Sequence, residues 1–128
     1  MSGRPAKVTN EGGITMADVM VDSAGVKELE ITVNGKVGTV VYRELSYWEK
    51  NLALSAATEY YQDETGGLRS RFHLETYVEE CLLKMIQQAP FPVNHMVLRG
   101  MRRVVGEQLA TIIPPANDGG PSDAAKKE

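Results

Sequence analysis

The sequence of 128 residues contains a single cysteine, Cys81, so no disulfide can form within one chain. It has no apolar run approaching the roughly 20 residues of a membrane-spanning helix. Its first residues, MSGRPAKVTNEGG, lack the apolar stretch of a signal peptide. Neither sign of charge dominates, since 14 Lys and Arg stand against 17 Asp and Glu, a formal net charge of −3. These features predict an intracellular protein without a generally nucleic-acid-binding surface.

Residues that carry chemistry are also scarce. The two histidines, His73 and His95, have no second cysteine or HExxH pattern to complete a metal-ligand set. Cys81 lies within an apolar helical stripe, which favours a small core side chain over a nucleophile. Glu79 and Glu80 would point about 100° apart on a helix, so we expect a solvated face there rather than a carboxylate pair. The sequence therefore predicts a non-enzymatic protein with no catalytic residue, cofactor or metal.

Composition divides the chain into one domain and two tails. Residues 1–24 mix small and polar side chains without sustained periodicity, which predicts a flexible N-terminal arm, although ITMADVMV (14–21) could become ordered against a partner. Residues 116–128 contain no large apolar side chain, which predicts a disordered C-terminal tail. The folded part is then 25–115, enough for one modest core.

The segment ELEITVNGKVGTVVYREL (28–45) has the pattern of a β-hairpin. Leu29, Ile31 and Val33 alternate with polar residues, as in a strand with one buried face. Asn34-Gly35 supplies the two residues that most easily adopt positive φ in a type I′ turn. The β-branched and aromatic residues from 37 to 42 then predict the second strand.

Three helices are predicted after the hairpin. The first follows a Ser46-x-x-Glu49 capping box, reaches the segment QDETGG (62–67), and has a core-facing side formed by Trp48, Leu52, Ala56 and Tyr60. The second covers about 72–88, with an apolar residue at every third or fourth position. The third runs from an Asn94 cap to about 112, weakened by Gly100 and Gly106. The fold class is therefore α+β, a hairpin followed by a three-helix bundle.

Candidate partner-binding residues lie on the predicted outer faces of these helices. Tyr47 and Tyr61 are expected to point outward, as aromatic anchors of interfaces often do. Methionines suit an adaptable apolar surface because they repack easily against different partners. The basic side of the third helix would pair with Glu75, Glu79 and Glu80, which we favour, or with an acidic protein surface or, third, with nucleic acid. The complete candidate set is Tyr47, Tyr61, Met96, Met101, Arg99, Arg102 and Arg103.

The order of these parts resembles the tail assembly chaperones of long-tailed bacteriophages. The residues that carry the resemblance are ITVNGKVGTVVYRELSYWE (31–49), followed by a middle helix of acidic and apolar residues and VVGEQLATIIPP (104–115). It covers roughly residues 28–115. The resemblance implies a protein of the host cytoplasm that binds the tape measure protein, keeps it soluble and helps recruit tail-tube subunits. It also implies no enzymatic activity, and homo-oligomers are possible.

Two other functions fit the same composition. A structural head–tail connector or neck protein would also be a small α+β or helical subunit, and it would tend to form closed rings. A small DNA-binding regulator would use the third helix, with Arg102 and Arg103 facing the phosphates. The negative net charge and the glycines of that helix disfavour the DNA-binding alternative.

Overall fold

The computed structural model describes residues 6, 8, 11–22 and 25–116, and every structural statement below concerns that part of the chain. The predicted C-terminal tail therefore lies outside the described residues except for Ala116. Most of the first ten residues of the predicted arm do so as well. The described part of the arm holds a short 3-10 turn, Glu11–Gly13, and a helix α1, Met16–Val19. No structural observation tests the predicted flexibility of the arm, so that flexibility stays a prediction.

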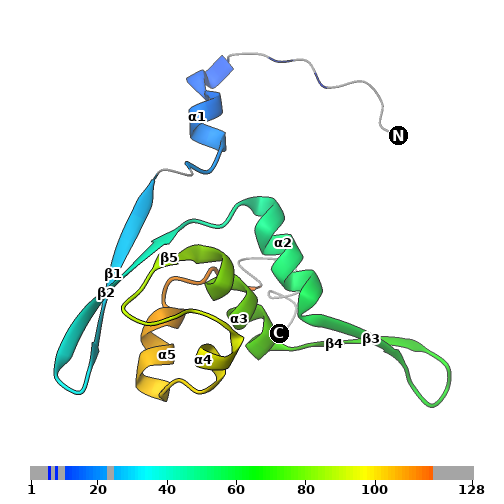
Figure 1. Ribbon diagram of the computed structural model, residues 1–128. Coiled ribbons are helices and arrows are strands. Elements are labelled where there is room, and N and C mark those ends of the chain that lie inside the picture. The colour runs from blue at the N-terminus through cyan, green and yellow to red at the C-terminus, as the bar shows by residue number, and fades with distance from the viewer. Residues whose placement is uncertain (1–5, 7, 9–10, 23–24, 117–128) are drawn as a thin grey trace, which may run out of the picture.

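The predicted hairpin is confirmed. Strand β1, Val26–Val33, pairs antiparallel with β2, Lys36–Arg43, in a register that places Val33 opposite Lys36 (Figure 1). At the turn between them, Asn34 and Gly35 have φ values of 54° and 75°, both left-handed as a type I′ turn requires. Ile31 and Val40 are buried, so the inner face of the hairpin packs on the core. A third strand, β5, Ile86–Gln88, adds antiparallel to β2 and gives the strand order β1-β2-β5.

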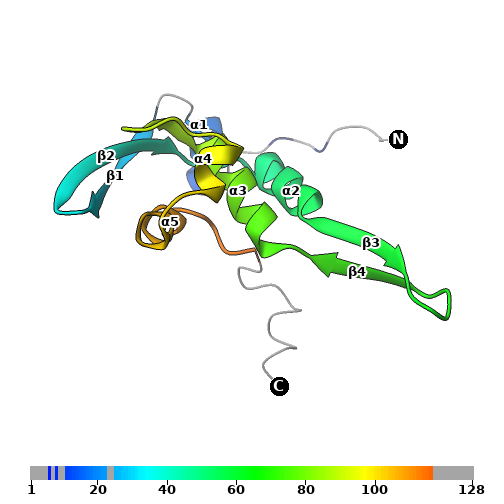
Figure 2. The ribbon, with the colours of Figure 1, turned by 60° about the horizontal axis from the view of Figure 1, so that its bottom comes forward.

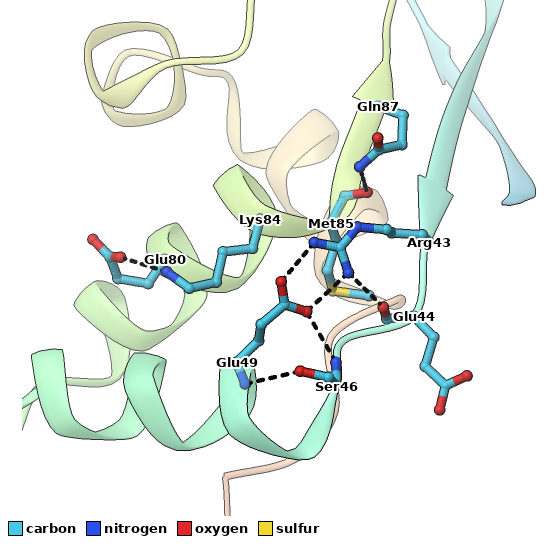
Figure 3. A network of polar contacts seen from close by, with 8 residues as sticks. All are labelled: Arg43, Glu44, Ser46, Glu49, Glu80, Lys84, Met85 and Gln87. Carbon is cyan, nitrogen blue, oxygen red and sulfur yellow. Dashed lines mark hydrogen bonds and ion pairs between the residues drawn. The ribbon is translucent and has the colours of Figure 1, made fainter. Parts of the chain in front are cut away.

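The predicted capping box opens helix α2, Tyr47–Ala56. The Glu49 amide donates to Ser46 Oγ at 3.1 Å, and the Ser46 amide donates back to Glu49 Oε1 at 3.0 Å (Figure 3). However, the predicted core-facing side of this helix is wrong. Trp48 is 67% exposed, Leu52 and Ala56 are also exposed, and the residue of α2 that is buried is Ala53. The helix thus packs through Ala53 and the half-buried Leu54, while Trp48 and Leu52 stay exposed.

The segment predicted to be the end of the first helix is instead a second hairpin. Strand β3, Thr58–Gln62, pairs antiparallel with β4, Leu68–Phe72, and the two project from the body of the protein (Figure 2). The turn is held by Asp63, whose Oδ1 accepts from the amides of Thr65 and Gly67 at 3.0 and 2.8 Å. Tyr60 lies on β3 and is 70% exposed, so its predicted core role is wrong. The β-branched and aromatic residues of TEYYQ outweigh the helical spacing here.

The second predicted helix is confirmed in its central part. Helix α3, Leu74–Met85, is shorter than the predicted 72–88 because Phe72 belongs to β4 and Ile86 begins β5. It crosses the centre of the molecule in Figure 1 and contributes the buried Tyr77, Cys81, Leu82 and Met85. Two core clusters lie on either side of it. One contains residues of α2 and α3, and the other joins Leu82 to β1, β2 and α5.

The third predicted helix is broken in two. Helix α4, His95–Arg99, ends at Gly100, and helix α5, Arg103–Ala110, begins after Arg102, whose backbone is extended (φ −62°, ψ 146°). Glycine costs about 1 kcal/mol relative to alanine inside a helix, so Gly100 is a reasonable place for the break. The Asn94 cap is confirmed, since Asn94 Oδ1 accepts from the Val97 amide at 2.9 Å.

The α+β class is therefore confirmed, whereas the three-helix bundle is not. Among the described residues, short helices are combined with two small antiparallel sheets. Helices α2 and α3 pack against each other, while α5 packs mainly against β1. None of the described helices is both long enough and apolar enough to cross a membrane.

Candidate partner-binding groove

An open apolar groove lies between the turn end of the first hairpin and the α4–α5 segment. It has a volume of about 540 Å³, within the range typical of small-ligand sites. Its lining contains one charged residue, Lys36, and no acidic one. The lining residues are Ile31, Val33, Lys36, Val37, Gly38, Pro90, Phe91, Met96, Val97, Gly100, Met101 and Val105.

Three segments that are distant in the sequence form this groove. The turn-proximal parts of β1 and β2 make one wall, and the connection after β5 crosses close to Gly38. A Cβ built at Gly38 would lie 3.0 Å from Pro90 Cγ, so a larger residue here would push the connection away. The Asn94 cap then starts α4 and sets Met96 and Val97 along the other wall. Local turn and cap chemistry thus positions the groove.

The groove has a buried floor and an exposed rim. Ile31 and Val105 are buried and belong to the core cluster shared by β1, β2 and α5. Met96, at the rim, is 80% exposed, and Val37 on the facing hairpin is also exposed. Apolar side chains held open to water on a stable floor are typical of a surface that binds another apolar chain. The two candidate methionines, Met96 and Met101, are brought together here.

Among the three candidate arginines, Arg99 is held by a buried carboxylate of the protein itself. Arg99 donates through Nε and Nη2 to the two carboxylate oxygens of Glu79, at 2.8 and 2.9 Å. His95 Nδ1 lies 3.1 Å from Glu79 Oε2. Glu79 is buried, so the predicted solvated face is wrong at this position. Because Arg99 and then His95 donate to it, the pKa of Glu79 is held below its ordinary value despite burial.

The favoured pairing of the basic side with three glutamates is confirmed only for Arg99. Glu75 lies 3.7 Å from His73 Nδ1, and Glu80 pairs with Lys84 at 3.2 Å. Arg103 reaches Glu107, one turn further along α5, at 3.4 Å. Arg102 makes no ion pair with any described residue, and both Arg102 and Arg103 are exposed beside Met101 of the groove.

The two candidate tyrosines lie elsewhere. Tyr47 is strongly exposed at the first turn of α2 and lines a separate pocket with Glu44 and Thr111. Tyr61 is half-buried on β3, where the Arg71 guanidinium sits 4.7 Å from its ring centroid. That distance is within the range of a cation–π contact. The structure therefore separates both tyrosines from the methionines of the groove.

The residues considered for chemistry have ordinary structural surroundings. Cys81 is fully buried, and burial raises the pKa of its thiol, which disfavours the reactive thiolate. His73 precedes α3, with Nε2 2.8 Å from Glu59 Oε1, and His95 begins α4. Within residues 11–22 and 25–116, no group of three or more His, Cys, Asp or Glu side chains is placed to hold a metal ion.

Sequence reasoning identified the methionines of the groove but missed the opposite wall. Val37, Pro90 and Phe91 contribute to that wall. In the segment APFPVN (89–94), an apolar aromatic residue stands between two prolines. This pattern already indicates a rigid connection that packs against another part of the chain. The alternation of β2 would place Val37 on the same face as Thr39, which gives no sign that Val37 borders a groove.

The chain matches no protein-family model, no curated protein and no solved structure.

Proposed function

We propose that this chain is a non-enzymatic tail assembly chaperone that acts in the host cytoplasm, binds the tape measure protein and helps recruit tail-tube subunits to it. The observation that carries the proposal is the open apolar groove, with Met96 exposed at its rim and Ile31 and Val105 fixed at its floor. A chaperone for a long apolar client needs such a surface to be available before the client arrives.

The groove suits an amphipathic helical segment of the client. Helix-in-groove recognition places apolar side chains at i, i+3, i+4 and i+7 into an apolar trough and leaves polar ones at its edge. The methionines can repack around different client side chains because the thioether chain is unbranched and flexible. Successive apolar segments of a long client would then be accepted by the same groove in different copies of the chaperone.

The basic residues at the edge add selectivity. Lys36 lines the groove, and Arg102 and Arg103 follow Met101 in the exposed segment before and within α5. Acidic side chains on the polar face of a client helix would lie beside them. Such exposed pairs contribute more to association rate and orientation than to affinity. Arg99 contributes less to this edge because Glu79 already holds it.

The experiment is co-expression with the proposed client, a large coiled-coil tape measure protein, followed by pull-down and a solubility assay. We expect the large protein to be soluble only when this chain is bound. Met96→Asp should reduce the soluble fraction at least several-fold, because a carboxylate would then have to be desolvated in the groove. Since Met96 is 80% exposed, the variant is expected to fold.

Leu68→Asp is the matched control, since Leu68 is similarly exposed but lies on β4, away from the groove. It should leave client solubility unchanged. Equal loss in both variants would contradict a role for the groove. Failure of the wild-type chain to bind, together with closed rings of this chain alone, would favour a connector. Salt-dependent DNA binding that is lost in Arg102→Ala would favour the regulator.

A further inference from the structure

The described part of the N-terminal arm carries apolar side chains that its own chain leaves uncovered. Ile14, Met16, Val19 and Met20 are 64%, 70%, 62% and 61% exposed. Met16 and Val19 are three residues apart on α1 and share one side of its turn, and Met20, whose backbone is extended, follows directly after them. A soluble chain rarely keeps such a row in water unless another surface covers it.

The local structure of this row is fixed by its own sequence. Thr15 precedes α1, and its amide and hydroxyl donate to Asp18 Oδ2 at 2.8 and 3.1 Å. These hydrogen bonds, the backbone one first, hold the pKa of Asp18 below its ordinary value, so the aspartate stays ionised at neutral pH. The apolar turn is thus already shaped when it meets a partner, which lowers the entropy cost of docking.

The arm and the groove have complementary chemistry. Residues 11–22 contain three acidic residues, Glu11, Asp18 and Asp22, and no Lys or Arg. The groove is lined by apolar side chains and Lys36, with Arg102 and Arg103 next to it. The apolar side chains of the arm therefore suit the apolar lining of the groove, and its acidic side chains are opposite in charge to the basic edge.

The arm lies at the wrong end of β1 to cover its own groove in this conformation. It precedes Val26, whereas the groove is lined by β1 from Ile31 onward. The eight residues of β1 span about 26 Å, and α1 lies beyond the end remote from the Asn34-Gly35 turn (Figure 1). The same arm on a neighbouring copy has no such constraint.

We propose that the segment Ile14–Met20 of one copy docks in the apolar groove of a second copy, so that the free protein associates with itself through exchanged arms. This inference does not rest on the chaperone proposal. If the two hold together, a client segment displaces the neighbour's arm, and self-association protects the apolar groove until a client is present.

The test uses the full chain and measures its mass as a function of concentration by analytical ultracentrifugation. We expect wild-type protein to associate reversibly. Met16→Asp in the arm and Val37→Asp in the groove should each weaken association at least tenfold, and both positions are exposed, so both variants should fold. Leu68→Asp, on β4, should associate like the wild type.

The decisive measurement is the association of the two variant chains after they are mixed. The Met16→Asp chain keeps an intact groove and the Val37→Asp chain keeps an intact arm, so an equimolar mixture should recover association that neither variant shows alone. A synthetic peptide of residues 11–22 should dissociate the wild-type oligomer.

A wild-type chain that stays monomeric at all concentrations overturns the proposal, and docking of the arm on its own chain would give that result. An oligomer unaffected by both variants also overturns it. Met16→Asp changes no residue that lines the groove, so client solubilisation by this variant tests the chaperone proposal separately.

Discussion

Arg43, the last residue of β2, donates two hydrogen bonds to the carboxylate of Glu49 in the first turn of α2, from Nη1 at 2.8 Å and from Nη2 at 2.7 Å (Figure 3). The same carboxylate accepts from the Ser46 amide, and Arg43 Nη1 also donates to the Glu44 carbonyl. One arginine and one capping box therefore fix the direction in which the chain leaves the first sheet and enters the helix.

This contact makes stability depend on pH. The hydrogen bond from Arg43, followed by that from the Ser46 amide, lowers the pKa of Glu49 from 4.5 to about 2. A carboxylate whose pKa is lower in the folded chain stabilises the fold above its unfolded pKa, and this contribution is lost as pH falls from about 5 toward 2. After allowance for solvent screening, we expect it to be about 1–2 kcal/mol.

Urea unfolding of wild type and Glu49→Gln between pH 2 and 7 measures this contribution. The difference in the free energy of unfolding should be largest at pH 7 and shrink toward zero near pH 2. Asp63 also has a pKa lowered to about 2, chiefly by Arg69, but it is present in both proteins and cancels in the difference. A difference in the free energy of unfolding that does not change with pH would contradict the lowered pKa of Glu49.

Leu109 of α5 is fully buried in the core cluster that also contains Ile31 and Val40. Leu109→Ala should reduce the free energy of unfolding by about 2–4 kcal/mol, through lost burial and the cavity that remains. Val104→Ala, on the half-exposed side of the same helix, should cost below about 1 kcal/mol. Chemical denaturation of both variants makes the comparison, and equal losses would show that α5 does not pack on the sheet as described.

The bidentate contact of Arg99 with Glu79 joins α4 to α3 and should be visible in titration. Arg99→Ala removes the first cause of the lowered pKa of Glu79, so that pKa should rise. The rise should be incomplete because His95 remains beside the carboxylate. Carboxyl NMR titration reads this directly, and Arg103→Ala, whose contact is with Glu107, is the control. No change in Arg99→Ala would mean that the ion pair does not form in solution.

Local rules predicted the parts of this fold that neighbouring residues determine. The Asn34-Gly35 turn, the Ser46–Glu49 box and the Asn94 cap all occur as the sequence predicts, because each depends on a few adjacent residues. Helical spacing gave a wrong prediction for residues 58–62, because a short amphipathic segment can form either a helix or a strand. Tyr60 continues the spacing of α2 but lies on β3, since strand pairing with Ser70 outweighs the local pattern.

The residues of the candidate groove were likewise predictable only in part. Met96 and Met101 were predicted from their residue type, but the groove requires the break at Gly100 and the approach of Pro90 to Gly38. The approach of Pro90 to Gly38 joins segments about 50 residues apart, and the local glycine penalty weakens a helix at Gly100 without fixing where the chain turns next. The burial of Glu79 was also not predictable from α3 alone, because it needs Arg99 and His95 from another helix.

The outer edge of β1 carries a specific side-chain contact that the sequence pattern does not reveal. Thr32 donates its amide to Gln108 Oε1 at 2.9 Å, and Gln108 Nε2 donates to the Thr32 carbonyl at 2.9 Å. The glutamine side chain thus replaces a neighbouring strand at this position of the sheet edge. Open edges are sites where another chain can pair, so this contact limits unwanted strand addition beside the groove.

We expect Gln108→Ala to cost about 1 kcal/mol of stability and to speed hydrogen exchange of the Thr32 amide, since its acceptor is removed. Exchange of the Ile31 amide should change less, because Ile31 lies in the core. Glu107→Ala, at the neighbouring exposed position of α5, should leave the Thr32 amide unchanged. Native-state hydrogen exchange followed by NMR measures the rates of the Thr32 and Ile31 amides in wild type and in both variants. If Thr32 exchanges equally fast in wild type and Gln108→Ala, the glutamine does not cap this edge, and the strand is protected by something other than its side chain.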